Sequence, residues 1–243
     1  MDTYKIFEYL LELNQESAKE LIKTYYNENN KNTLITIPNN SDDKIRISEQ
    51  ELRLAMVCLH GQCYHPDLLF SIETPTVRKY SFSGKIKRSA SSDLTFFHNN
   101  KRILNVELKA HNPKQVSINK DIEKLVKESK VGDRPYGAWC HIFKNENKAT
   151  IERLFEKLNI ALNKYRDKDT RPISFHILIL KSRVLLSRKG RDFDKTILKN
   201  EHLFNIRYNN WKNLSPGKYH FNNGILVDEN SSNTDYDWQV DKF

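Results

Sequence analysis

Two acids and a lysine near the middle of the chain have the types and the spacing of residues that act together on a substrate. Asp93 lies in one run of strand-forming residues, and Glu107 and Lys109 lie in the next. The polar segment 98–102 between the runs contains the turn signal Asn99-Asn100. Strand formers on both sides of such a segment predict a β-hairpin.

The register of this hairpin decides whether the charged groups meet. If 98–102 is the loop, Phe97 pairs with Ile103, and counting back along both strands places Asp93 opposite Glu107. Side chains alternate with period two, so Lys109 shares their face. The opposite face is apolar enough to pack against a core helix, and it carries Leu94, Phe96, Leu104, Val106 and Leu108.

Two carboxylates on opposing strands repel each other unless a cation or a shared proton offsets their charge. A divalent metal with hard oxygen ligands, Mg²⁺ or Mn²⁺, meets this requirement. Lys109 is then placed to orient or deprotonate a metal-bound water, or to neutralise charge that develops on a phosphate. The pattern predicts a hydrolytic site for a phosphodiester.

At these residues the chain resembles the PD-(D/E)XK phosphodiesterase superfamily of restriction-endonuclease-like nucleases. The family pattern, an acid on one strand and Glu-x-Lys on the next, matches Asp93 and Glu107-Leu108-Lys109, although Ser92 stands where the named motif has proline. The resemblance implies a metal-dependent endonuclease, on DNA more than RNA, in restriction, mobile-element or phage defence. It assigns catalysis to Asp93, Glu107 and Lys109, and metal binding to Asp93, Glu107 and Leu108.

The resemblance also implies a further acid, usually from the helix that precedes the sheet. Glu49, Glu51 and Glu73 compete for this role. Glu51 is favoured as a catalytic and metal-binding residue because it lies about ten residues before Gly61 in the expected helix. Glu73, on the strand before the hairpin, is the second choice. Glu51 also completes a capping box with Ser48, which alone would account for it.

Positive charge concentrates around the hairpin. The formal net charge is +9, and residues 78–130 contain thirteen Lys and Arg against five Asp and Glu. A basic surface around acids is what a hydrolase of a polyanion needs. A generally basic, Lys-rich composition explains the total charge but explains its concentration around the hairpin less well. The expected phosphate contacts are Lys85, Lys87, Arg88, Lys114, Lys120 and Lys124.

Other signals narrow the class of protein. Cys58, Cys63 and Cys140 show no Cys-x-x-Cys spacing, so neither a zinc ribbon nor a disulfide framework is predicted. No signal pattern and no long apolar run occur, so we expect a protein of the cytoplasm without a membrane partner. The non-enzymatic alternative is a basic module that binds nucleic acid or protein and whose acids are structural.

The order of elements predicts an α/β fold with a mixed central β-sheet flanked by helices. A helix from Ser48 to Gly61 is followed by an extended segment (64–80), the hairpin, a helix (116–129), a strand (137–143), a helix (150–165) and a strand from Ser174 that continues as far as 180 or 186. We expect residues 45–190 to form the nuclease core. Residues 1–44 are expected to be a helical addition, which packs on the core or forms a homodimer surface. Residues 191–243 are expected to be an extension with an acidic tail.

Overall fold

The computed structural model describes residues 3–26, 33–37, 47–63, 65, 67–81, 86–144, 148–165, 171, 173–180, 183–188, 217–222, 225–228 and 237–242. Its elements in chain order are α1 (Thr3–Tyr26), α2 (Glu49–Cys63), β1 (Leu68–Tyr80), β2 (Arg88–His98), β3 (Lys101–Ala110), α3 (Gln115–Glu128), β4 (Tyr136–Phe143), α4 (Lys148–Tyr165), β5 (Ile173–Ile179), β6 (Val184–Arg188), β7 (Gly217–Asn222), β8 (Ile225–Asp228) and β9 (Asp237–Lys242). From α2 to β5 this is the order that the sequence predicts.

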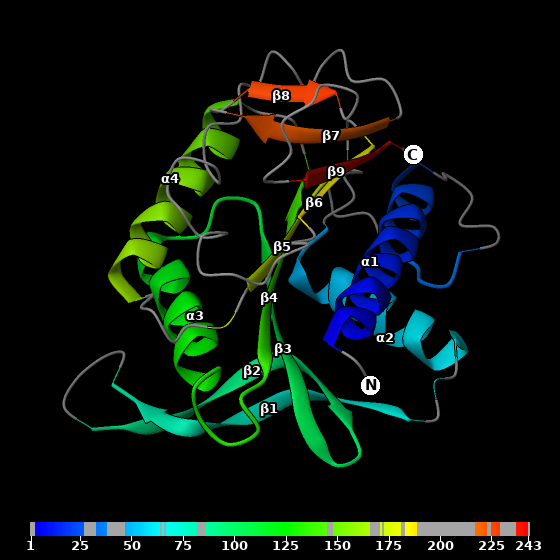
Figure 1. Cartoon of the computed structure of the whole chain (residues 1–243). Coiled ribbons are helices and arrows are strands. Elements are labelled where there is room, and N and C mark those ends of the chain that lie inside the picture. The colour runs from blue at the N-terminus through cyan, green and yellow to red at the C-terminus, as the bar shows by residue number, and fades with distance from the viewer. Residues whose placement is uncertain are drawn as a thin grey trace.

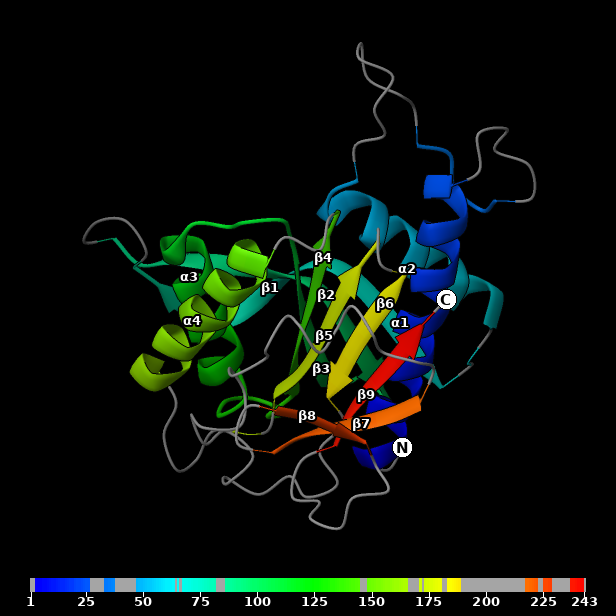
Figure 2. The same ribbon diagram turned by 90° about the horizontal axis from the view of Figure 1, so that it is seen from above.

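The strands form one mixed sheet in the order β1-β2-β3-β4-β5-β6-β9-β7-β8. β3, β4 and β5 run parallel to one another, whereas β1, β2 and β3 form an antiparallel meander. Helices α1 and α2 cover one face of the sheet, and α3 and α4 cover the other (Figures 1 and 2). The predicted α/β fold with a mixed sheet flanked by helices is confirmed.

The face of the hairpin that was predicted to be apolar packs under α1 and α2. Leu94, Phe96, Leu104, Val106 and Leu108 are all buried, and they belong to one hydrophobic cluster with residues of both helices. The cluster extends from Ile6 and Leu10 of α1 to Leu178 of β5. The N-terminal helix therefore shares the core of the sheet, and it runs unbroken through Asn14, whose amide donates to the Leu10 carbonyl at 2.8 Å.

The opposite face packs under α3, which approaches the sheet closely at β4. A Cβ built on Gly137 would lie 3.3 Å from Leu125 Cβ and 3.3 Å from Ile173 Cγ1. The missing side chain therefore sets how near the middle of α3 can lie to the sheet. The position of α3 matters because its residues complete the candidate site.

The hairpin turn differs from its prediction. His98 pairs with Lys101 and Phe97 with Arg102, so the loop is only Asn99-Asn100, and the predicted Phe97–Ile103 pair is wrong. Both asparagines have positive φ, 51° and 59°, as in the turn that suits the twist of a two-residue hairpin. An irregularity at Ile103 restores the register, and Phe96–Leu104, Thr95–Asn105 and Leu94–Val106 pair as predicted.

Two predicted boundaries are also wrong. Gly61 does not end its helix, because α2 continues to Cys63, and among the described glycines only Gly132 has the positive φ of a helix C-cap. The strand that begins near Ser174 does not continue to Leu186. Instead the Arg183 N–H donates to the Leu180 carbonyl at 3.0 Å, and β6 returns antiparallel to β5.

The region predicted as a C-terminal extension contributes β7, β8 and β9, which continue the sheet beyond β6. Residues 191–216 lie outside the described residues. In the part of the chain that the structure describes, no helix is both long enough and apolar enough to cross a membrane.

Gly137→Ala should destabilise the fold by about 1–3 kcal/mol, because the added methyl group meets the backbone-proximal Cβ of Leu125, which cannot swing away. Gly61→Ala is the matched control. No atom lies within 4 Å of a Cβ at Gly61, so this helical substitution should stabilise the protein by about 0.5–1 kcal/mol. Chemical denaturation of both variants checks the pair, and equal midpoints would contradict the close packing at β4.

Candidate functional site

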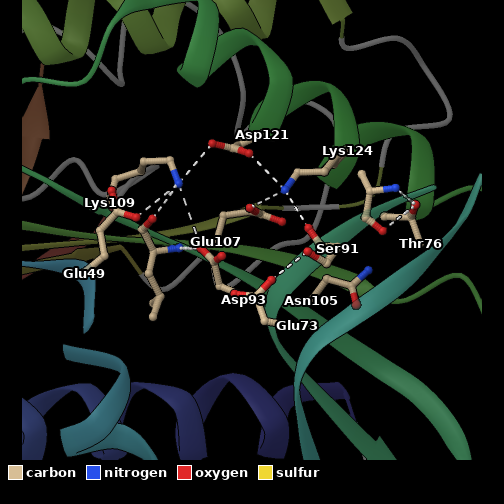
Figure 3. Close-up of polar contacts among 12 residues, drawn as sticks. Glu49, Glu73, Thr76, Ser91, Asp93, Asn105, Glu107, Lys109, Asp121 and Lys124 are labelled. Atoms are coloured by element: carbon tan, nitrogen blue, oxygen red, sulfur yellow. Dashed lines mark hydrogen bonds and ion pairs between the residues drawn. The ribbon is translucent and has the colours of Figure 1, made fainter. Parts of the chain in front are cut away.

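The polar face of the hairpin is buried beneath α3. Thr95 and Asn105 are directly paired, and the Thr95 hydroxyl donates to Asn105 Oδ1 at 3.1 Å. Further along the same face lie Asp93, Glu107 and Lys109, whose side chains gather below α3 (Figure 3). Glu107 and Lys109 are buried, so this is not a solvated surface of a hairpin.

β2 and β3 separate at Asp93. Their last pair is Leu94–Val106, and beyond it Asp93 Oδ2 accepts a hydrogen bond from the Leu108 N–H at 2.6 Å. The Asp93 carboxylate thus accepts the hydrogen bond of a backbone N–H that would pair with a backbone carbonyl if the two strands continued side by side. The two strands diverge where the acids lie, and the side chains of Asp93 and Glu107 stay adjacent.

Glu107 is fully buried and only half satisfied. Its Oε2 accepts from Lys124 Nζ at 2.7 Å, whereas its Oε1 is buried without a hydrogen-bond partner among the described residues. Burial raises the pKa of Glu107 well above its ordinary value, Lys124 opposes this rise, and Asp121 and Asp93 add to it. A buried oxygen of this kind favours a proton or a cation beside it.

Lys109 lies among three acids. Its Nζ is 3.1 Å from Asp121 Oδ2, 3.7 Å from Glu49 Oε2 and 3.9 Å from Asp93 Oδ2, and it donates to the Leu108 carbonyl at 2.7 Å. Burial alone would lower the pKa of Lys109, but Asp121, Asp93 and Glu49 outweigh burial and raise it. Lys109 is therefore a protonated ammonium group at neutral pH, suited to neutralise negative charge.

α3 contributes a carboxylate that the sequence analysis missed. Asp121 binds both ammonium groups, Lys109 through Oδ2 and Lys124 through Oδ1 at 2.9 Å. A signal for it exists in the sequence, because Asp121 stands three residues after Ile118 and four before Leu125, on the helix side that faces the sheet.

Lys124 belongs to the interior and not to a nucleic-acid surface. It is 7% exposed, and it binds Glu107, Asp121 and the Ser91 carbonyl, the last at 2.8 Å. The prediction that Lys124 contacts phosphates is therefore wrong. A lysine next to the apolar side of a helix can point toward the sheet when a carboxylate on the sheet forms an ion pair with it, as Glu107 does with Lys124.

Of the three acids predicted as candidates for the further metal-binding acid, the structure places one beside Lys109. Glu49, the first residue of α2, is the residue that lies there, and burial, opposed by Lys109, raises its pKa. Glu51 instead accepts from the Ser48 N–H at 2.6 Å and from the Ser48 hydroxyl at 2.5 Å, which is the capping box. Glu73 accepts from Arg53 at 2.5 Å and from the Ser91 hydroxyl at 2.7 Å.

The remaining predicted phosphate contacts differ in exposure. Lys87, Arg88 and Lys114 are exposed, Lys120 is half-buried, and Lys85 lies outside the described residues. Arg88 is the first residue of β2, the strand that carries Asp93, and Lys87 directly precedes it. Exposed positive charge thus lies on the strand of Asp93, five residues before it.

The cluster has more acid than base. Among the described residues, Glu49, Asp93, Glu107 and Asp121 form ion pairs with Lys109 and Lys124 alone, so the formal charge of the cluster is −2 when all six groups are ionised. Among the described residues, no three Asp, Glu, His or Cys side chains converge closely enough to enclose a metal ion as they stand. The ammonium groups of Lys109 and Lys124 lie between the carboxylates (Figure 3).

Comparisons with known proteins do not place the chain in a family. No family model matches it, and neither a curated protein nor a solved structure is significantly similar.

Glu107→Gln should gain stability relative to the wild type as pH rises from about 4.5. The pKa of Glu107 is raised in the fold from its ordinary value of 4.5, so the folded wild type holds a proton that the unfolded chain releases. The free energy of unfolding of the wild type therefore falls as pH rises through this window, and glutamine escapes that loss. Urea unfolding in EDTA at pH 4.5 and 8 measures the change.

Glu12→Gln controls for the loss of one charge, because Glu12 is an exposed residue of α1. If the free energy of unfolding of the Glu107 variant differs from that of the wild type by the same amount as the control's at both pH values, burial does not destabilise the ionised form of Glu107.

Proposed function

We propose that the protein is a Mg²⁺- or Mn²⁺-dependent nuclease that hydrolyses phosphodiester bonds of nucleic acid. One observation carries the proposal. Glu107 is buried with one free carboxylate oxygen beside Asp93 and Lys109, at the point where β2 and β3 separate. A fold does not retain such an arrangement for stability alone, because an uncompensated buried oxygen costs free energy.

The donor types, but not their present spacing, suit a hard divalent cation. The cluster offers carboxylate oxygens from Asp93, Glu107 and Glu49, and its formal charge of −2 matches one such ion. We assign metal binding to Asp93 and Glu107 with Glu49 as the third acid, and we retain the Leu108 carbonyl as a further oxygen of the same site. When bound, the ion would act as a Lewis acid and would lower the pKa of a water molecule.

The side chains of this chain have separate tasks in the proposal. Lys109, held protonated by its acidic neighbours, neutralises charge that develops on the phosphate. Asp121 holds Lys109 and Lys124 in place, and Lys124 fixes Oε2 of Glu107 so that Oε1 points away from it. Asp121 and Lys124 are positioning residues.

Charge supports a nucleic acid as the substrate. The net charge of +9 and the exposed basic residues on the strand of Asp93 attract a polyanion toward acids that would otherwise repel it. DNA is the expected substrate, with RNA as the alternative. We place the activity in the cytoplasm, where the thiols of Cys58 and Cys140, both free, stay reduced.

One observation favours a second candidate, a nucleic-acid-binding module without catalysis. Lys109 and Lys124 already pair with the acids, so the cluster can serve as an internal ion network that fixes α3 on the sheet. The two candidates differ in whether Mg²⁺ has any effect on bound nucleic acid.

The wild type should cut plasmid DNA in Mg²⁺, and EDTA should abolish cutting. Asp93→Asn, Glu107→Gln and Lys109→Met should each lower the rate by at least about 100-fold, as expected when a charge that stabilises the transition state is lost. Gel electrophoresis of supercoiled plasmid measures the rate. Lys101→Met, an exposed lysine at the hairpin turn, is the control and should cut normally. Undiminished cutting by the Glu107 variant would exclude this site.

Glu49→Gln should lower the rate at least about tenfold, because Glu49 is the third acid beside Lys109. Glu51→Ala should cut at the wild-type rate but lose about 1 kcal/mol of stability with its capping box. Plasmid cleavage and thermal unfolding of both variants separate the roles. If the Glu51 variant is inactive while the Glu49 variant cuts, the third acid is Glu51, and the assignment of Glu49 fails.

A further inference from the structure

Part of the β1–β2 ribbon has no third strand. β1 pairs with β2 from Leu68–His98 to Tyr80–Arg88, but β2 pairs with β3 only from His98 to Leu94. Among the described residues, the chain beyond Asp93 therefore forms a two-stranded ribbon, residues 74–80 and 88–92, whose pairing register shifts between Pro75 and Lys79. This ribbon passes α3 and reaches the edge of the molecule in both views (Figures 1 and 2).

The ribbon is fixed to the end of α3 by one buried carboxylate. Glu128, 1% exposed, accepts from the Val77 N–H at 2.8 Å, the Arg78 N–H at 3.0 Å and the Tyr80 hydroxyl at 2.8 Å. Across the ribbon, Thr76 Oγ1 bonds both the N–H and the carbonyl of Ala90 at 3.1 Å. These contacts hold the ribbon in a defined direction relative to the site.

The ribbon exposes basic side chains of the types that bind nucleic acid, together with the apolar side chain of Val77. Arg78, Lys79, Lys87 and Arg88 are exposed, and the sequence between Thr74 and Ser92 contains no acid. Arg and Lys bind phosphates and also read the acceptor edge of guanine. The ribbon therefore carries positive charge and no acid in its own sequence, and the buried Glu128 of α3 is the carboxylate that contacts it among the described hydrogen bonds.

The acidic side chains in and beside the candidate site differ in exposure. Exposure of the acidic side chains rises from 0% at Glu107 through 21% at Asp93 to 40% at Glu49 and 55% at Glu73. Glu73 lies in β1 beside the root of the ribbon. Asp93 and Arg88 lie on the same strand, so a polymer that reaches Asp93 along β2 also meets the ribbon.

We propose that the ribbon enters the major groove of B-form duplex DNA about five base pairs from the bond that is cut. This rests on the proposed function for the position of the cut but not for the binding itself. Five residues separate Arg88 from Asp93, which is about 17 Å of strand, and about five base pairs at roughly 3.4 Å each.

Groove dimensions favour duplex DNA over RNA. The B-DNA major groove is about 12 Å wide and admits a two-stranded β-ribbon. The major groove of an A-form RNA helix is deep and narrow, and side chains do not reach its base edges. The ribbon therefore binds duplex DNA in preference to duplex RNA. Asp93 and Glu107, where the ribbon joins the sheet, then act on the DNA strand that lies against them.

Fluorescence anisotropy in Ca²⁺ tests the surface with a 24-base-pair DNA duplex, the RNA duplex of the same sequence and the single DNA strand. The wild type should prefer the DNA duplex by at least about tenfold. Lys87→Glu/Arg88→Glu should weaken that binding at least tenfold and reduce the salt slope by about 2. Lys5→Glu/Lys101→Glu makes the same change of charge at exposed positions off the ribbon and should bind nearly as the wild type does.

Methylation protection tests the groove with the wild-type protein, so it does not depend on a variant that folds. Guanine N7 lies in the major groove, and protection should centre about five base pairs to one side of the cut made in Mg²⁺. Equal affinity for the RNA duplex, equal losses in both charge-reversed variants, or no N7 protection would each overturn the ribbon assignment. Protection and ribbon-dependent binding without any cleavage in Mg²⁺ would uphold the ribbon and refute only the proposed nuclease activity.

Discussion

The ion pair between Glu107 and Lys124 is the interaction on which the rest of the site depends. Both groups are buried, and they meet at 2.7 Å between the sheet and α3. Removing two charges from water costs several kcal/mol per ion, and their attraction offsets this cost only when further hydrogen bonds complete the geometry. Lys124 has these additional bonds, to Asp121 and to the Ser91 carbonyl, whereas Glu107 keeps one oxygen without a partner. The unsatisfied atom is therefore a carboxylate oxygen of Glu107, which is the kind of atom that binds a cation.

α3 connects the acids to the ribbon because its charged residues follow helical spacing. Asp121, Lys124 and Glu128 lie three and four residues apart, so one side of the helix faces the sheet with all three. The first two bind the lysine and the acid of β3, and the third holds the backbone of β1. Gly137 permits this because it lets α3 approach β4. A shift of α3 would therefore move the acids and the ribbon together.

The sequence predicted well which helices and strands form the core and which side chains share a face of the hairpin. It predicted less well which side chains of different elements contact one another. Alternation along β2 and β3 survives small errors, so Asp93 and Glu107 were placed together although the turn was wrong. The sequence does not separate Glu49 from Glu51, because the two acids are neighbours at one helix start. A capping box identifies Glu51 locally, but only the position of α2 on the sheet shows that Glu49 reaches Lys109. For the same reason Lys124, read as a surface lysine, could not be assigned to Glu107, seventeen residues away.

Strand distortion concentrates where the acids meet. β1 and β2 pair at Ile72–Leu94 and again at Thr74–Ser92, and between these pairs Glu73 has a φ of 48°. A non-glycine residue in this region is strained, and strain of this kind persists only where surrounding contacts enforce it. Here Arg53 and Ser91 hold the Glu73 carboxylate, and on the other side of β2 the Asp93 carboxylate replaces a strand pair with β3. β2 therefore departs from regular pairing on both edges at one level, and this separates its first half from the sheet as a ribbon while leaving the carboxylates of Asp93 and Glu107 at the junction.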